Sequence, residues 1–336
     1  MNLVDRMGAA TRWLLSGVFA LLVLGWSAGN AGAATDFAAW VGDLRREAVG
    51  RGISTCVLDA ALHGVAPLPR VIELDRKQPE RTITFARYLD RVVTPARVRR
   101  GRALHAEHRA LLEEIGHRYG VQPRFIVALW GIETDFGRNT GGFDVIAALA
   151  TLAYDGRRSA YFRSELLDAL EILEQGHVRP EAMKGSWAGA MGQCQFMPSS
   201  FRRYAVDADG DGRRDIWSTL PDVFASTANY LGQAGWNPRY TWGREVRLPN
   251  GFGAAGGGLD IRFPLDEWHR RGVRAADESD LPAVDIEGSL VLPDGPGGRA
   301  FLVYGNYRSI MKWNRSSYFA TAVGILADRI GSDAKS

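Results

Sequence analysis

The chain has 336 residues, of which 46% are hydrophobic and 24% charged, so it is long enough to bury a large core, and disordered and fibrous classes are excluded. Its 41 basic and 38 acidic residues leave a net charge of +3, too small for a chain built to neutralise phosphates, so nucleic acid is not an expected partner. Only two cysteines, Cys56 and Cys194, are present, which excludes a disulfide framework and a cysteine-rich zinc site.

Residues 1–33 have the layout of a secretory signal peptide. Arg6 and Arg12 precede an apolar stretch over 13–26, and Ala-Gly-Ala at 31–33 offers a small-residue cleavage site. A stretch of this length is short for a bilayer span, although an uncleaved anchor helix is the alternative. We therefore expect an exported, periplasmic bacterial protein with no stable membrane span after signal cleavage.

The remaining chain divides into four predicted parts. Apolar residues spaced by three and four predict an N-terminal helical domain over 34–120, and the same pattern continues through a core domain over 121–240 that glycine-rich and acidic loops interrupt. From 241 to 310 the hydrophobic period changes to two, which predicts a small β domain, and 311–336 holds a last helix that packs back on the core. The predicted fold class is therefore mainly α with a small β region (α+β).

Three familiar motifs occur without their structural context. The glycine-rich segment 251–256 is followed by strand-like residues instead of a helix, so it predicts a loop and no dinucleotide site, and no organic cofactor is expected. Ser186 is one position out of register for a nucleophile elbow, which disfavours a serine hydrolase. His105 and His108 lack a third ligand nearby, so a histidine metal site is also disfavoured.

One carboxylate is unusual in its surroundings. Pro123 is expected to start a helix that Gly137 ends, and eight of the ten residues over 125–134 are apolar or glycine, with Glu133 the only ionisable group. Burial among apolar neighbours disfavours the charged form and can keep this carboxyl protonated near neutral pH, as a general acid requires. Asp135 lies about 200° around the helix and cannot pair with it. A buried structural glutamate is the alternative.

The second chemical feature is a glycine-rich run over 185–200. It reads Gly-Ser-Trp-Ala-Gly-Ala-Met-Gly-Gln-Cys-Gln-Phe-Met-Pro-Ser-Ser. Small residues let a ligand approach the backbone, while Ser186, Gln193 and Gln195 supply neutral hydrogen-bonding groups, a combination that suits a sugar. A tight structural loop is the alternative.

These segments resemble the lytic murein transglycosylase B family. The resemblance rests on Gly-Ile-Glu-Thr at 131–134, the run over 185–200, Asn-Tyr at 229–230 and Trp-Asn-Arg-Ser at 313–316, and it extends over almost the whole chain after residue 33. No lipid-acceptor cysteine lies near the cleavage point, so the chain resembles a soluble, non-lipoprotein member. The resemblance implies a lysozyme-like core with a helical domain and a small β domain around it.

The resemblance also implies an activity and a site. The activity is cleavage of the β-1,4 bond between N-acetylmuramic acid and N-acetylglucosamine in peptidoglycan glycan strands, with Glu133 as catalytic acid and base. The expected substrate-binding residues are Tyr88, Ser186, Gln193, Gln195, Tyr230, Trp313 and Asn314. Trp313 stands where a tyrosine is usual in the family. Partner proteins in cell-wall synthesis do not follow from the sequence.

A single candidate carboxylate favours one mechanism. An ordinary glycosidase uses two carboxylates. If Glu133 protonates the leaving oxygen and then removes the proton from the sugar's own C6 hydroxyl, neither a second carboxylate nor water is needed, and the product carries a 1,6-anhydromuramoyl end. A hydrolytic muramidase and a non-catalytic peptidoglycan-binding scaffold are the alternatives.

The acidic loop after the glycine-rich run predicts a calcium site. Asp207, Asp209 and Asp211 reproduce the D-x-D-x-D-G spacing, and the carbonyl of Arg213 would be the next ligand. The twelfth position is a serine instead of the usual glutamate, and the family resemblance points to a longer loop closed by Asp222. We expect structural Ca²⁺ on these five residues; solvated Asp-Gly turns are the alternative.

The two cysteines present an open choice. A bond between Cys56 and Cys194 would connect the N-terminal helical domain to the core. Disulfide geometry is demanding and a buried free cysteine behaves as a small apolar residue, so we expect two free thiols.

Overall fold

The computed structural model describes residues 26–77, 83–253 and 256–332. The predicted signal peptide, 1–33, lies outside these residues except where helix α1 (Trp26–Gly50) begins. Within the described ranges, no helix combines the length and the hydrophobicity that crossing a bilayer would demand.

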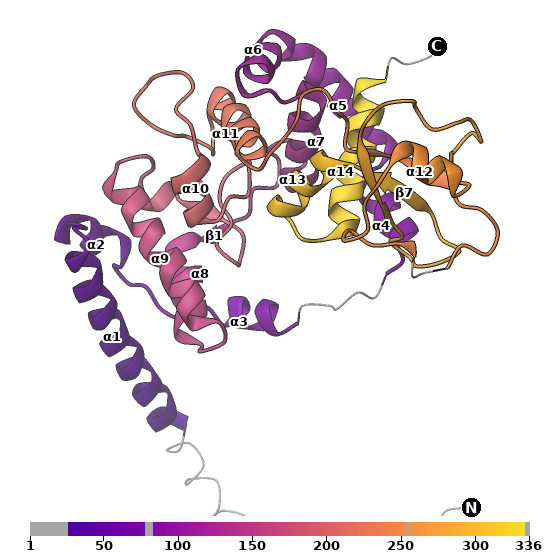
Figure 1. Ribbon diagram of the computed structural model, residues 1–336. Helices are drawn as coiled ribbons and strands as arrows, with labels where there is room; N and C mark the ends of the chain where they lie inside the picture. The colour runs from indigo at the N-terminus through magenta and orange to yellow at the C-terminus, as the bar shows by residue number, and fades with distance from the viewer. Residues whose placement is uncertain (1–25, 78–82, 254–255, 333–336) are drawn as a thin grey trace, which may run out of the picture.

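Helices make up most of the structure (Figure 1). The first part of the chain forms α1, α2 (Thr55–Ala61), α3 (Pro69–Arg76), α4 (Phe85–Val92), α5 (Pro95–Glu107) and α6 (Arg109–Tyr119). The middle part forms α7 (Pro123–Thr134), α8 (Val145–Tyr154), α9 (Ser159–Glu174), a 3₁₀ turn (Pro180–Ala182), α10 (Pro198–Tyr204) and α11 (Leu220–Gln233). The last part forms α12 (Leu265–Arg270), α13 (Gly305–Trp313) and α14 (Ser317–Gly331).

The helix starts follow from local chemistry. Proline occupies the first turn of α3, α5, α7 and α10, where its missing N–H leaves no hydrogen bond unmade. Side-chain oxygens of Thr84, Asp144 and Ser316 accept hydrogen bonds from the first turns of α4, α8 and α14. The sequence therefore sets where the chain turns into each of these helices.

Two antiparallel sheets complete the fold. The smaller sheet pairs β1 (Phe143–Asp144) with β2 (Lys184–Gly185). The larger sheet has the order β4-β6-β7-β3-β5 and consists of β3 (Gly243–Arg247), β4 (Phe263–Pro264), β5 (Arg274–Ala275), β6 (Glu287–Val291) and β7 (Ala300–Val303). It lies in the segment where the hydrophobic period changes to two, so the predicted mainly α fold with a small β region is confirmed.

One large apolar core joins helices from every part of the chain. It includes Leu44 of α1, Leu112 of α6, Ile126 of α7 and Leu326 of α14, and α7 packs against α5, α6, α11 and α14. A second, smaller core supports the larger sheet and includes Val246, Trp268 and Leu302. Helices from the predicted parts 34–120 and 311–336 thus share a core with 121–240, and the proposed domain boundaries stay predictions.

Both cysteines are free thiols in the structure. Cys56 is exposed on α2, while Cys194 is buried, with its Sγ 3.4 Å from the carbonyl oxygen of Val223 and 3.5 Å from Oγ1 of Thr227. Burial raises the pKa of the Cys194 thiol to about 12. Cys194 therefore faces α11 in the core.

Gly324 tests how closely α14 must approach the β region. A Cβ atom at Gly324 would lie 2.2 Å from the buried ring of Trp242. Gly324→Ala should therefore lower the free energy of unfolding by about 1–3 kcal/mol, measured by urea titration, although alanine favours helix. Gly42→Ala on α1, where the nearest atom lies at 3.8 Å, should raise it by about 0.5–1 kcal/mol. Equal stabilities of the two variants would contradict this packing.

Candidate active site

Glu133 lies in the last turn of α7, at the end of a helix that is buried over 125–131. The helix ends at Thr134 instead of continuing to Gly137, because Asp135 and Phe136 both adopt left-handed backbone angles, with φ of 52° and 61°. This reversal folds the Phe136 ring onto Gly131, where a Cβ atom would lie 2.7 Å from the ring. The turn leaves the Glu133 side chain partly exposed at the edge of the core.

The surroundings of Glu133 favour its neutral form. Burial raises the pKa of the Glu133 carboxyl from 4.5 to about 7, and a hydrogen bond from Trp313 opposes part of this rise. Nε1 of Trp313 donates this bond to Oε1 at 2.7 Å. Among the described residues, no second carboxylate contributes to the pKa of Glu133. Asp135 instead pairs with Arg97 and Arg138.

Aromatic side chains form a wall beside Glu133. The ring centroid of Trp313 lies 4.7 Å from that of Tyr230 and 5.1 Å from that of Phe196, and the tilted ring of Tyr204 lies 4.3 Å from that of Tyr230. The Tyr230 hydroxyl donates to the carbonyl oxygen of Lys312 at 2.7 Å, and the residue is only 9% exposed. Tyr230 therefore offers a small part of its ring, and not its hydroxyl, to a ligand. The sequence did not predict that Phe196 and Tyr204 would complete this wall.

The glycine-rich run forms a compact turn next to α7. A Cβ atom at Gly141 would lie 2.1 Å from the carbonyl oxygen of Gly185, so these two backbone segments touch. Oγ of Ser186 accepts a hydrogen bond from the backbone N–H of Ala190 at 3.0 Å. Nε2 of Gln195 donates to the carbonyl oxygen of Thr140 at 3.0 Å. Ser186 and Gln195 are both partly exposed on this turn.

Gln193 lies elsewhere than predicted. Its side chain is buried, Oε1 accepts from Nε1 of Trp130 at 2.7 Å, and Nε2 donates to the carbonyl oxygen of Trp217 at 2.9 Å. Both polar groups are thus used inside the protein. The geometry does not support Gln193 as a substrate contact, and assigns it to holding Trp130 under the end of α7.

Two further predicted residues border the site. Tyr88 on α4 is partly buried, and its pKa is raised by burial and by the negative charge of Glu133, which places it near that carboxyl. Asn314 is exposed directly after α13, and its Oδ1 accepts from the N–H of Ser316 at 3.0 Å. The structure therefore brings Tyr88, Tyr230, Trp313 and Asn314 from three separate segments toward the end of α7.

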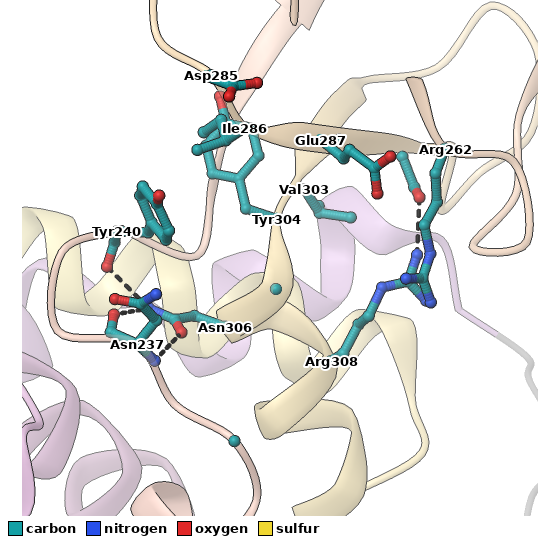
Figure 2. A pocket seen from close by; sticks show the side chains of 14 residues that line it. Asn237, Tyr240, Arg262, Asp285, Ile286, Glu287, Val303, Tyr304, Asn306 and Arg308 are labelled. Atoms are coloured by element: carbon teal, nitrogen blue, oxygen red, sulfur yellow. Dashed lines mark hydrogen bonds between the residues drawn. The ribbon is translucent and has the colours of Figure 1, made fainter. Parts of the chain in front are cut away.

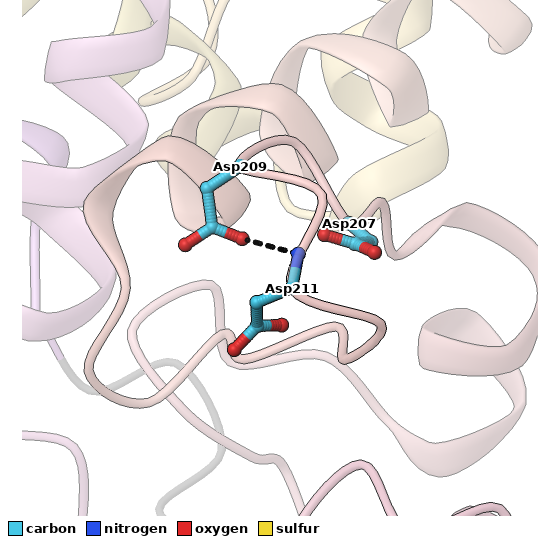
Figure 3. Close-up of side chains that lie close together, drawn as sticks. All are labelled: Asp207, Asp209 and Asp211. Atoms are coloured by element: carbon cyan, nitrogen blue, oxygen red, sulfur yellow. Dashed lines mark hydrogen bonds between the residues drawn. The ribbon is translucent and has the colours of Figure 1, made fainter.

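The acidic loop gathers three of its five predicted metal residues (Figure 3). Asp207, Asp209 and Asp211 each offer an oxygen, and these atoms lie within 4.8 Å of one another. Asp222 is fully buried and accepts hydrogen bonds from the N–H groups of Ala208 at 2.7 Å and Asp215 at 2.6 Å. It is therefore an anchor for both ends of the loop and lies outside the three-carboxylate group.

The last predicted metal residue bonds within the loop. Arg213 donates through its side chain to Oδ2 of Asp211 at 3.0 Å, and its backbone N–H donates to Oδ1 of the same residue at 2.8 Å. These bonds orient the Asp211 carboxylate. A clustered set of hard oxygen donors fits a Ca²⁺ ion in its chemistry.

A separate pocket of about 350 Å³ lies between the segment after α11 and the larger sheet (Figure 2). Asn306 stabilises one wall, because its Nδ2 donates to the carbonyl oxygens of Asn237 at 2.9 Å and Tyr240 at 2.8 Å. Arg262 and Arg308 point toward each other on another wall, with Glu287 nearby. None of the predicted site residues lines this pocket.

The chain is similar to known proteins over most of its length. The transglycosylase SLT domain family matches residues 36–328. Over 259 residues, 73% of this chain, it is 33% identical to the membrane-bound lytic murein transglycosylase B of Escherichia coli (strain K12), of which it covers 67%.

Solved structures agree with this relationship. SltB3 from Pseudomonas aeruginosa, in complex with NAG-NAM-pentapeptide, is 47% identical with a TM-score of 0.86, covering 88% of this chain and 80% of that one. The same protein in complex with NAG-anhNAM-pentapeptide gives a TM-score of 0.85. Slt35 from Escherichia coli, in complex with calcium, is 29% identical with a TM-score of 0.73, covering 89% and 92% of the two chains. The chain therefore belongs to the lytic murein transglycosylase B family, as an enzyme built on a lysozyme-like core.

Proposed function

We propose that this lytic murein transglycosylase cleaves the β-1,4 bond between N-acetylmuramic acid and N-acetylglucosamine in peptidoglycan and leaves 1,6-anhydromuramoyl ends. The observation that carries the proposal is a single carboxyl, Glu133, whose pKa of about 7 lets it hold a proton at neutral pH and also lose it. The two SltB3 complexes support this choice, since their ligands differ in the anhydro form of the muramoyl sugar.

In the reaction, Glu133 donates one proton to the substrate and later takes one proton back. Protonated Glu133 gives its proton to the glycosidic oxygen as the C1–O4 bond breaks and its electrons pass to that oxygen. The carboxylate then removes the proton of the C6 hydroxyl while O6 forms a bond to C1, and Glu133 returns to its starting form. Because O6 belongs to the same sugar, its attack gains from proximity, and the substrate's N-acetyl group can stabilise the positive charge in between.

The remaining site residues would bind the glycan strand. Ser186 and Gln195 present neutral polar groups on the glycine-rich turn, and Trp313 and Tyr230 present aromatic surface beside Glu133. Tyr88 and Asn314 lie at the margins of the same region. An uncharged site of this kind suits a sugar, whose hydroxyls need hydrogen bonds and whose ring faces stack on aromatic groups.

We further propose that the chain is exported and acts in the periplasm. Residues 1–33 carry the charged, apolar and small-residue segments of a signal peptide in the correct order. The proposed substrate lies outside the cytoplasmic membrane, so a transglycosylase must be exported to meet it.

We also propose that Asp207, Asp209 and Asp211 hold a structural Ca²⁺ ion. Gly210 and Gly212 adopt positive φ angles of 77° and 89°, which lets the loop fold the three carboxylates inward. Three exposed or partly exposed like charges this close repel one another, and a divalent cation would remove that cost. The ion would stabilise the segment between α10 and α11, and Glu133 needs no metal for the reaction above.

Glu133→Gln should reduce turnover of purified peptidoglycan by about 10²–10⁴-fold, because the amide keeps the shape of the side chain but carries no transferable proton. Asp135→Asn removes the carboxylate two residues away and should stay within tenfold of the wild type. Mass spectrometry of the released muropeptides measures both and should find anhydro ends from the wild type. Mainly reducing ends would favour the muramidase, and full activity of Glu133→Gln would remove Glu133 from its role.

Glu133→Gln should also stabilise the fold at alkaline pH. The folded pKa of about 7 lies above the unfolded value of 4.5, so the folded state binds the proton more tightly. This stability is present below pH 4.5 and is lost as the pH rises through about 7. The variant would not lose this stability, so it should be about 3 kcal/mol more stable than the wild type at pH 8, with a smaller difference at pH 4.5.

Chemical denaturation at the two pH values measures this effect. Glu114→Gln, which changes an exposed glutamate on α6, serves as the matched control and should follow the wild type. A stability difference for Glu133→Gln that is the same at both pH values would show that burial of the Glu133 charge is not its cause.

Millimolar calcium should raise the midpoint of thermal unfolding relative to chelator, because an ion that binds only the folded state stabilises it by mass action. Asp207→Ala combined with Asp211→Ala should abolish the response. Asp43→Ala combined with Asp59→Ala removes two exposed carboxylates on α1 and α2 and should preserve it. Equal midpoints of the wild type in chelator and in calcium would reject the site.

A further inference from the structure

The two oxygens of the Glu133 carboxyl have different surroundings. Oε1 accepts the hydrogen bond from Nε1 of Trp313 at 2.7 Å. Among the described residues no hydrogen bond reaches Oε2, and Oε2 is not one of the completely buried polar atoms that lack a partner, so it keeps some contact with solvent. One oxygen is thus occupied by the protein, and the other is free to exchange a proton with a substrate.

We propose that Trp313 is a positioning residue that places the transferable proton of Glu133 on Oε2. This inference rests on the proposed function and assigns the proton to one atom. An indole N–H can donate a hydrogen bond but cannot accept one. A proton on Oε1 would leave Trp313 donating to a hydroxyl oxygen, which is a weaker acceptor than a carbonyl oxygen, whereas a proton on Oε2 leaves Oε1 as the carbonyl acceptor of this bond.

The same bond suits both steps of the reaction. In the neutral acid, Oε1 accepts from Trp313 and Oε2 carries the proton toward the glycosidic oxygen. After that proton leaves, Oε1 still accepts from Trp313, and the bare Oε2 can take the proton of the C6 hydroxyl. Proton donation and proton abstraction therefore both occur at Oε2, and the carboxyl need not rotate between the two steps.

The indole is held firmly enough for this task. Its ring packs against Phe196 and Tyr230, and Tyr230 in turn fixes the last turn of α13 through its bond to the carbonyl oxygen of Lys312. A tyrosine at this position would carry a hydroxyl that both donates and accepts. The indole can only donate, so Trp313 favours the proton on Oε2, whereas a tyrosine could bond to either form of Oε1.

Other groups near Glu133 do not replace this bond. The negative charge of Glu133 contributes to raising the pKa of Tyr88 on α4 and of Cys194 on the glycine-rich turn. The pKa of Tyr88 is raised above its usual value of 10 and that of Cys194 to about 12, so both groups are neutral at pH 7. Asp135, beyond the end of α7, is paired with Arg97 and Arg138. Trp313 is the only group among the described residues whose hydrogen bond lowers the pKa of Glu133.

The test compares Trp313→Phe, which keeps a ring but removes the donor, with Trp313→Tyr, which restores a donor. Carbon-13 labelling of glutamate carboxyls allows NMR titration of Glu133, whose signal is the one missing from Glu133→Gln. Trp313→Phe should raise the pKa of Glu133 by about one unit, since a hydrogen bond to a carboxylate is lost, and should shift the basic limb of the pH profile of kcat equally. Trp313→Tyr should return both values toward the wild type.

Two controls separate positioning from general damage. Tyr204→Phe changes the same aromatic wall without touching Glu133 and should leave the titration and the basic limb unchanged. KM of Trp313→Phe should stay within about twofold while kcat falls, because the phenyl ring preserves stacking. The inference is overturned if Trp313→Phe unfolds cooperatively, as a folded protein does, and Glu133 in it titrates as in the wild type. Failure of the proposed function would appear instead as wild-type products without anhydro ends, and the carboxyl titration would still be readable.

Discussion

The chemistry of the site depends on one physical constraint, which is the removal of water from the Glu133 carboxyl at the end of the buried helix α7. A carboxylate in water has no tendency to hold a proton at pH 7, so α7 must be surrounded by protein before Glu133 can act as an acid. The packing of α5, α6, α11 and α14 around α7 supplies this surrounding. The helices that precede and follow α7 in sequence therefore help to set the pKa of Glu133.

Close backbone approach is the second constraint, and it explains where glycine is needed. Gly131 makes room for the Phe136 ring after the left-handed reversal, and Gly141 and Gly185 let two loops touch beside the site. A side chain at Gly141 would push the glycine-rich turn away from the loop after α7, and one at Gly131 would displace the Phe136 ring. The small residues that suggest ligand access in the sequence thus serve the assembly of the site first.

Much of the site could be predicted from the sequence because its chemistry is local. Pro123 and the apolar run after it predict a buried helix with one carboxyl, and the spacing of Asp207, Asp209 and Asp211 predicts their convergence. Details that depend on neighbours distant in the chain could not be predicted. Gln193 turns inward because Trp130 and the backbone of Trp217 offer it partners that no local pattern reveals.

The end of α7 is a second such detail, and the aromatic wall is a third. Glycine at 137 is the usual signal for a helix end, yet the helix ends two residues earlier, where Asp135 takes the left-handed conformation and pairs with Arg97 of α5 and Arg138. Phe196, Tyr204, Tyr230 and Trp313 come from separate segments whose meeting depends on how α10, α11 and α13 pack. Likewise, helices assigned to separate domains share one core, since hydrophobic periodicity shows that a face is buried but not against which helix.

The central claim is that Glu133 alone handles both protons and that water takes no part in breaking the bond. Digestion of purified peptidoglycan in ¹⁸O-labelled water, followed by mass spectrometry of the muramoyl ends, tests it most directly. We expect ends that are one water lighter than the hydrolysed sugar and contain no ¹⁸O. Reducing ends that carry one ¹⁸O atom at C1 would show that water is the nucleophile, and would contradict the account.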